Sequence, residues 1–180
     1  MATRKVRALA LSLLALGIGS RAHSAERYGI GRSATEAEIA AWNIDIDRDG
    51  RKLPPGSGSV VRGREVFEAQ CASCHGNRGE GGTGERLAGG QGTLASAKPV
   101  KTVGSFWPYA PTLFDYIRRA MPMNAPQSLN DDDVYAVSGY VLHLNGLVPE
   151  EAVFDAKSLA AVRMPNRDGF VPDPRPDVKP

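Results

Sequence analysis

The pattern of apolar and polar positions predicts two main helices. Between residues 131 and 145, Val or Leu recurs at every third or fourth position, which gives one apolar stripe along a helix. A second helix is predicted from Ser59, a favourable N-cap residue, to about Cys74, with apolar residues gathered on one side. Both segments are long enough to bury a side chain at each turn, so we expect them to form the core.

Shorter helices and long loops account for most of the remaining chain. A Thr-x-x-Glu capping box precedes a predicted helix over residues 36–42, and a proline suited to a first helical turn precedes another over 112–120. Residues 52–59 are rich in Pro and Gly, and residues 76–93 are rich in Gly, so both are predicted to be loops. From residue 165 the chain is rich in proline. The predicted fold class is therefore all-α, with long irregular loops and an extended C-terminal tail.

Residues 1–25 have the layout of a secretory signal peptide. Three basic residues within the first seven precede an uncharged apolar run over residues 8–19, and small residues follow it. The run is too short to span a bilayer as a helix of the mature protein. We predict cleavage near Ser24 or Ala25 and a periplasmic location, with no membrane insertion after processing.

Cleavage would reverse the sign of the formal charge. The whole chain has 22 basic and 20 acidic side chains, a balance of +2. The leader holds four of the basic residues and no acidic residue, which leaves 18 against 20, a balance of −2. Because the mature chain also lacks a long basic run, the sequence argues against a nucleic-acid partner.

The sequence Cys71-Ala72-Ser73-Cys74-His75 has the C-x-x-C-H pattern of covalent haem attachment. Residues three and four apart near a helix end project from one face, so both thiols can reach one edge of a porphyrin. His75 can then offer an imidazole nitrogen to the iron. A zinc site would need further Cys or His ligands, and a redox-active dithiol would need a βαβ context, so we predict one haem c.

The second axial ligand of the iron has four candidates, Met121, Met123, Met164 and His143. We favour Met121, because it follows an amphipathic helix and precedes a proline, where the chain must change direction. A thioether ligand raises the haem potential, which suits an electron acceptor. Any of these methionines could instead fill the core, and His143 lies off the apolar stripe of its helix.

Two aromatic residues, Trp107 and Tyr109, are candidates for lining the haem pocket. Their N–H and O–H groups could donate hydrogen bonds to a propionate, and ordinary packing is the alternative. Arg118 and Arg119 could neutralise a propionate, but we favour a solvated basic face for them.

With these features in place, the chain resembles the class I cytochromes c. Gly63 and Phe67 on the first long helix, and Tyr140 on the last, look like the contact where the terminal helices of that family cross. Further blocks are similar to the cytochrome subunit of bacterial sulfite dehydrogenases and sulfur (sulfane) dehydrogenases. These blocks are residues 28–50, 53–63, 87–94, 99–122, 125–129 and 164–170.

The resemblance implies a domain order and a set of haem ligands. After the signal peptide at 1–25 it implies an N-terminal extension over 26–58, a cytochrome c domain over 59–148 and a C-terminal extension over 149–180. Carried over by position, His75 and Met121 would be the axial ligands of the iron.

The resemblance also implies a function. Such cytochromes accept electrons one at a time from a subunit with a molybdenum cofactor that oxidises sulfite or sulfane sulfur, and pass them to the respiratory chain through a downstream cytochrome or oxidase. Some sulfane dehydrogenase cytochromes carry a second haem domain, whereas this chain has one C-x-x-C-H, which favours a monohaem partner of a sulfite dehydrogenase. No independent catalysis is expected, and the alternative is a general periplasmic carrier for another dehydrogenase or a terminal oxidase.

Overall fold

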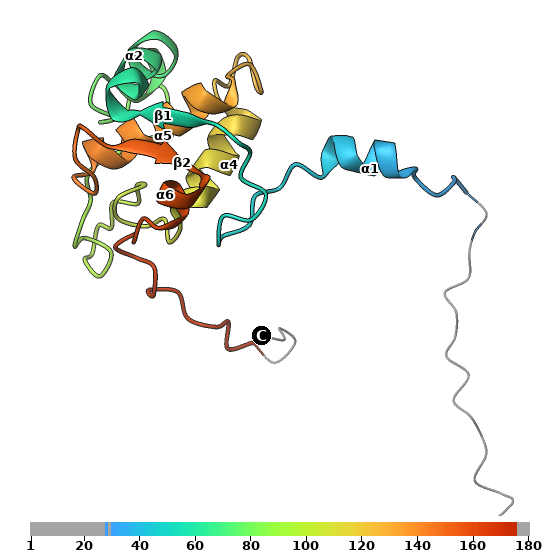
Figure 1. The fold of residues 1–180 in the computed structure, drawn as a ribbon. Helices are drawn as coiled ribbons and strands as arrows, with labels where there is room; N and C mark the ends of the chain where they lie inside the picture. The colour runs from blue at the N-terminus through green and yellow to red at the C-terminus, as the bar shows by residue number, and fades with distance from the viewer. Residues whose placement is uncertain (1–27, 29, 176–180) are drawn as a thin grey trace, which may run out of the picture. The chain divides into compact units, whose positions relative to one another are not determined.

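The computed structural model describes residue 28 and residues 30–175, which form six helices and two short strands (Figure 1). The chain divides into two units, Met1–Ala40 and Ala41–Pro180. The elements are α1 (Glu36–Trp42), β1 (Ser57–Ser59), α2 (Val60–Gln70), α3 (Ala72–His75), α4 (Ala110–Ala120), α5 (Asp131–Leu144), β2 (Val153–Asp155) and α6 (Ala156–Ala160). The predicted leader lies outside the described residues.

Helix α1 begins at the predicted capping box. The Glu38 backbone N–H donates to Thr35 Oγ1 at 3.3 Å, and the Thr35 N–H donates to the Glu38 carboxylate at 2.8 Å. The Arg32 guanidinium also binds that carboxylate, and Arg32 together with Thr35 holds the pKa of Glu38 at about 2. No residue of α1 is buried, and these local interactions hold its first turn.

The core centres on the crossing of α2 and α5. Gly63 lies against the backbone of α5, where an added Cβ would be 1.9 Å from the Ala136 carbonyl oxygen. Beside it, the rings of Phe67 and Tyr140 pack with their centroids 5.3 Å apart. The absence of a side chain at Gly63 permits this close approach, and the two aromatic rings fill the space around it. The contact expected between Gly63, Phe67 and Tyr140 is confirmed.

Helix α4 packs on another face of α5. Phe114 and Tyr135, both fully buried, have ring centroids 4.5 Å apart. The Tyr135 hydroxyl donates to the Pro54 carbonyl at 2.7 Å, so its polar tip is satisfied inside the core. Residues Val134 to Leu142 of α5 are all buried, which makes α5 the central helix and not a surface helix with a single apolar stripe.

Two short strands lie beside α5 (Figure 1) and were not predicted. β1 pairs antiparallel with β2, with Gly58 opposite Phe154, so the expectation of a loop through residue 59 is wrong for the last three residues. The Phe154 ring is buried and lies against Gly139 of α5. Ser-Gly-Ser has no strand propensity of its own, and its pairing partner is distant in sequence, so only the tertiary fold creates this sheet.

The segment after residue 149 contributes to the same core. Besides β2 it forms α6, whose N-cap Asp155 accepts from the Ser158 N–H at 2.7 Å. Leu159 is fully buried and Met164 is 1% exposed, so both anchor this segment to the domain. Beyond them, residues 168–175 are exposed. Within the described part of the chain, no helix has both the length and the apolar character needed to cross a membrane.

Candidate haem site

The helix predicted to run through to Cys74 is interrupted at Cys71. There the backbone takes φ −122° and ψ −38°, which ends α2 at Gln70 and starts α3 at Ala72. The Cys74 and His75 N–H groups both donate to the Cys71 carbonyl, at 3.1 and 3.0 Å. This tight turn sets the positions of the two cysteines and the histidine relative to one another.

The two cysteines form no disulfide bond with each other. Cys71 is half-buried and packs against the core, whereas Cys74 is exposed. Burial, together with the neighbouring Cys74, raises the pKa of the Cys71 thiol to about 11. Both side chains are therefore available as thiols for the thioether bonds that the C-x-x-C-H pattern predicts.

The ring of His75 is oriented by a backbone carbonyl. Its Nδ1 lies 2.7 Å from the Glu85 carbonyl oxygen. A carbonyl can only accept, so Nδ1 carries the proton and donates, which leaves the lone pair on Nε2 for a metal. This is the arrangement that an axial haem ligand needs, and sequence reasoning did not identify Glu85 because its backbone, not its side chain, does the work.

The glycine-rich loop after His75 folds back onto the attachment turn. The Gly81 N–H donates to the His75 carbonyl at 2.7 Å, and the Gly84 N–H donates to the Cys74 carbonyl at 2.8 Å. An added Cβ at Gly84 would lie 2.9 Å from His75 Cε1, so the loop backbone runs against the imidazole ring. The loop therefore holds the ring as well as covering it.

A buried asparagine at the C-terminal end of α5 connects this loop to the core. Asn145 Nδ2 donates to the Leu87 and Val141 carbonyls at 3.1 and 2.9 Å, and its Oδ1 accepts from the Gly89 N–H at 3.0 Å. Its side chain thus fixes the loop that carries Glu85 to the end of α5. An Asn-Gly pair commonly ends a helix, so no local feature of residues 145–146 distinguishes this role from helix capping.

The three methionine candidates occupy different environments. Met121 is the C-cap of α4, where its N–H donates to the Ile117 carbonyl at 3.0 Å, and its half-buried side chain packs against the core. Met123 is 80% exposed, whereas Met164 is 1% exposed and belongs to the core cluster. Core filling therefore accounts for Met164, and Met121 is the candidate that is partly buried at a change of chain direction.

His143 and the two arginines of α4 have other partners. His143 Nδ1 lies 3.1 Å from the Val148 carbonyl oxygen, and its ring stacks on Tyr140. Arg118 pairs with Asp131 at 3.1 Å, and Arg119 pairs with Asp115 at 3.0 Å. These ion pairs favour a structural role for the arginines over one toward a propionate.

Trp107 and Tyr109 lie in the segment that leads into α4, and both are half-buried. Trp107 packs edge-on against Tyr116 with centroids 5.8 Å apart. Tyr109 is the N-cap residue of α4, and the guanidinium carbons of Arg167 and Arg48 lie 4.8 and 5.9 Å from its ring centroid. Cation–π contacts therefore join the start of α4 to Arg48 in the predicted N-terminal extension and to Arg167 in the predicted C-terminal extension.

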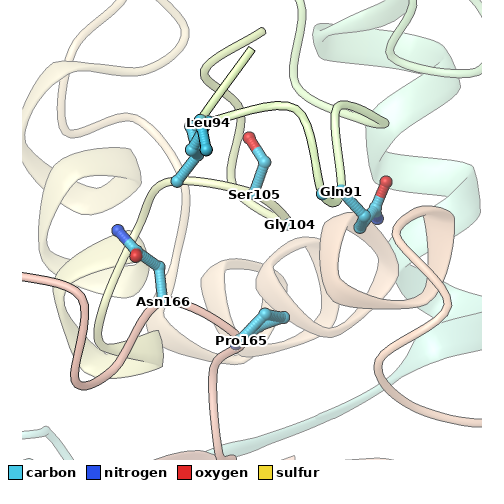
Figure 2. Close-up of a pocket in the computed structure, with 8 residues that line it drawn as sticks. Gln91, Leu94, Gly104, Ser105, Pro165 and Asn166 are labelled. Atoms are coloured by element: carbon cyan, nitrogen blue, oxygen red, sulfur yellow. The ribbon is translucent and has the colours of Figure 1, made fainter. Parts of the chain in front are cut away.

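A pocket of about 280 Å³ lies between residues 91–105 and the start of the tail (Figure 2). Its lining includes Gln91, Leu94, Ser105, Pro165 and Asn166 and no titratable side chain. Gln91 donates to the Asn145 carbonyl, Ser105 to the Val100 carbonyl and Asn166 to the Phe106 carbonyl. Since these polar groups already support the fold, we assign no ligand to this pocket.

Comparison with known proteins establishes the family. The family model for cytochrome c matches residues 60–145. A chain in the crystal structure of the sulfane dehydrogenase SoxCD from Paracoccus pantotrophus is 45% identical, with a TM-score of 0.76, covering 83% of this chain and 74% of that chain. The chain belongs to the cytochrome c family. The cytochrome is therefore an electron carrier with a mostly helical fold, as predicted, and its family binds haem c covalently.

A second solved structure is more distant. Cytochrome cL from the marine methylotrophic bacterium Methylophaga aminisulfidivorans is 20% identical, covering 66% of this chain and 71% of that chain, with a TM-score of 0.33. A search of the curated proteins finds no match. Among the residues that the structure describes, no three His, Cys, Asp or Glu side chains gather as a metal site. The attachment turn fits haem c, because it offers two thiols for attachment to the porphyrin and one oriented imidazole for the iron.

Proposed function

We propose that this cytochrome is a periplasmic monohaem electron carrier. Cys71 and Cys74 would attach one haem, and His75 and Met121 would be the axial ligands of its iron. The orientation of His75 by the Glu85 carbonyl supports this, because it fixes the tautomer that leaves Nε2 free. The single C-x-x-C-H supports one haem, and the leader-like residues 1–25 support export to the periplasm.

We further propose that the cytochrome accepts electrons from a molybdenum-cofactor dehydrogenase that oxidises sulfite or sulfane sulfur. The observation that carries this proposal is the 45% identity to a chain of the sulfane dehydrogenase SoxCD. The match covers 83% of the chain, whereas the general cytochrome c model covers only residues 60–145, so the likeness extends beyond features common to cytochromes c. A monohaem chain suits a carrier that passes single electrons onward to a downstream cytochrome or oxidase.

The residues of the chain set the properties of the bound iron. When bound, haem c supplies the one-electron couple. The Glu85 carbonyl accepts from Nδ1 of His75 and so increases the basicity of Nε2, which favours ferric iron. A thioether from Met121 favours ferrous iron and raises the potential. The opposing effects of these two ligands would set the reduction potential of the haem, which determines whether the carrier can accept electrons from its donor.

The attachment edge, defined as residues 71–76, is the expected contact for the donor. Ser73 and Cys74 are exposed, and His75 and Gly76 are half-buried, so this turn reaches the surface of the domain. A carrier that exchanges electrons there needs only a small contact. Because the formal charge of the mature chain is close to zero, we expect salt to slow electron transfer only moderately.

Mass spectrometry tests the haem proposal. The mature protein should exceed the mass of its chain by one haem, and the haem should resist acid–organic extraction. Cys71→Ala with Cys74→Ala should release it. A mass with two haems, or release from the unaltered protein, would contradict the proposal.

Stopped-flow spectroscopy tests the partner. Ferric cytochrome mixed with sulfite and the molybdenum enzyme encoded beside it should be reduced within the turnover time of that enzyme, and sulfite alone should act far more slowly. Equal rates with and without the enzyme would refute the donor while leaving the haem proposal intact.

A further inference from the structure

The segment from residue 28 to residue 42, here called the arm, exposes an unusual amount of apolar surface. Its large apolar side chains Tyr28, Ile30, Ile39 and Trp42 are 86%, 92%, 43% and 85% exposed. Isolated apolar side chains on a protein surface need no explanation, but four in one short segment provide apolar area that is available for binding. Trp and Tyr are also the side chains most enriched at the energetic centres of interfaces.

The arm is ordered by local interactions without a core of its own. A helix as short as α1, with seven residues, is marginal in isolation. Here the Thr35 capping box and the Arg32–Glu38 ion pair hold its first turn. The arm would therefore lose less conformational entropy on binding a partner than a disordered tail would lose. This smaller entropic cost favours binding.

The arm lies outside the general cytochrome c match but is partly inside the SoxCD match. The family model begins at residue 60. The SoxCD chain match covers 83% of a 180-residue chain, about 149 residues, whereas the unit from Ala41 to Pro180 has only 140. The match must therefore include part of the segment before Ala41. The arm is thus not required by the cytochrome c domain as such, and it is shared in part with a chain of a sulfane dehydrogenase.

We propose that the arm is a docking segment for the dehydrogenase that donates electrons to this cytochrome, an inference that rests on the proposed function. The arm would lay Trp42 and Ile39 into an apolar groove of that enzyme. Glu36 and Glu38 of α1 outnumber the one basic residue of the described arm, Arg32, which pairs with Glu38, so the arm has a formal charge of −1 that a basic rim around the groove would complement. The same acidic helix disfavours anionic lipid and the matching face of a second copy.

Such an arm separates binding from electron transfer. Apolar contacts in the arm would hold the carrier near the enzyme at high effective concentration, while the attachment edge makes the small contact through which electrons pass. Apolar burial is little affected by moderate salt, whereas contacts between exposed charges weaken. The arm therefore predicts a complex that persists as salt is raised.

The test measures binding of the mature ferric cytochrome to the immobilised cognate molybdenum enzyme by surface plasmon resonance, at low and high salt. Trp42→Ala should weaken the affinity at least tenfold at both salt concentrations, as expected for the loss of a central aromatic contact. Val171→Ala, which truncates an 84%-exposed apolar side chain in the opposite tail, is the matched control and should change the affinity less than twofold. The visible spectrum should be the same in both variants.

Three results would overturn the proposal. The first is equal affinity for Trp42→Ala and Val171→Ala. The second is a cytochrome that sediments as a dimer which Trp42→Ala dissociates, since a second copy would then cover the arm. The third is Trp42-dependent binding to phosphatidylglycerol vesicles without binding to the enzyme. Failure of the proposed donor itself is recognised separately, because the unaltered cytochrome would then neither bind the enzyme nor be reduced by it with sulfite.

Discussion

At the crossing of α2 and α5, Gly63 lies against the backbone of the neighbouring helix, and this makes Gly63→Ala a sharp test of the fold. The new Cβ would be 1.9 Å from the Ala136 carbonyl oxygen, 2.5 Å from its carbon and 2.8 Å from Tyr140 Cβ. Two of these atoms belong to the backbone of the most buried helix, so no flexible side chain can move aside. The helices themselves must separate.

The distances give the size of the effect. Real Cβ contacts essentially never fall below 3.0 Å, so the gap at Ala136 must widen by about 1.1 Å. Separation on that scale forfeits a quarter to a half of the dispersion energy of the affected contacts, including those of the Phe67–Tyr140 pair. Overpacking at such a rigid contact costs about 3 kcal/mol, the upper end of the usual range. The better helix propensity of alanine offsets about 1 kcal/mol, which leaves a net loss of about 2 kcal/mol.

Guanidinium unfolding of the ferric holoprotein, followed by circular dichroism, measures this loss. With a slope of about 4 kcal/mol per molar for a domain of this size, the midpoint should fall by about 0.5 M. Glu68→Ala, at an exposed position of the same helix, is the control and should change the stability by less than about 0.5 kcal/mol. If Gly63→Ala unfolds at the same midpoint as this control, the close crossing of α2 and α5 is wrong.

Three further predictions concern the haem ligands and the core. Met121→Ala should abolish the sulfur-to-iron absorption band of the ferric protein and lower its midpoint potential. Met123→Ala should preserve both the band and the potential, and loss of the band in this variant would identify Met123 as the ligand instead. Gly84→Ala should press a methyl group against the His75 ring and shift the midpoint potential measured by voltammetry, and an unchanged potential would show that the loop does not hold the ring. Burial raises the pKa of Tyr135 from 10.0 to about 12, so the unfolded chain ionises first and stability should fall between these pH values. Thermal unfolding should show a shallower fall for Tyr135→Phe over that range, and an identical fall would refute the raised pKa.

Local sequence determined α1, most of α5 and the attachment motif, whereas the break between α2 and α3 at Cys71 and the short helix α6 were not predicted. The capping box at Thr35 and the apolar period after residue 131 act over a single turn of helix, so they can be recognised without knowledge of the fold. The bounds observed for α1 are those predicted, and α5 ends one residue earlier than predicted. The same holds for Cys71, Cys74 and His75, whose spacing within one turn identifies them as a haem-attachment motif whatever surrounds them.

Contacts between distant segments determined what the sequence did not reveal. The pairing of β1 with β2 joins residues far apart in sequence, and the Ser-Gly-Ser sequence of β1 has no local signal for a strand. Met121 and Met164 cannot be distinguished by chemistry, and only the packing of the C-terminal segment buries Met164 in the core. The proton on His75 is likewise assigned by a carbonyl ten residues away, which any residue at position 85 could supply.

The sequence by itself therefore determined which side chains can carry the chemistry, and the tertiary structure decided how they are held. The spacing of two thiols and one imidazole within five residues is a property of the covalent chain, so it can be read directly from the sequence. The orientation of the imidazole depends on backbone groups of the loop, and that loop is fixed in turn by Asn145 at the end of α5. Backbone donors and acceptors are the same at every residue except proline, so their partners become known only when the chain has folded.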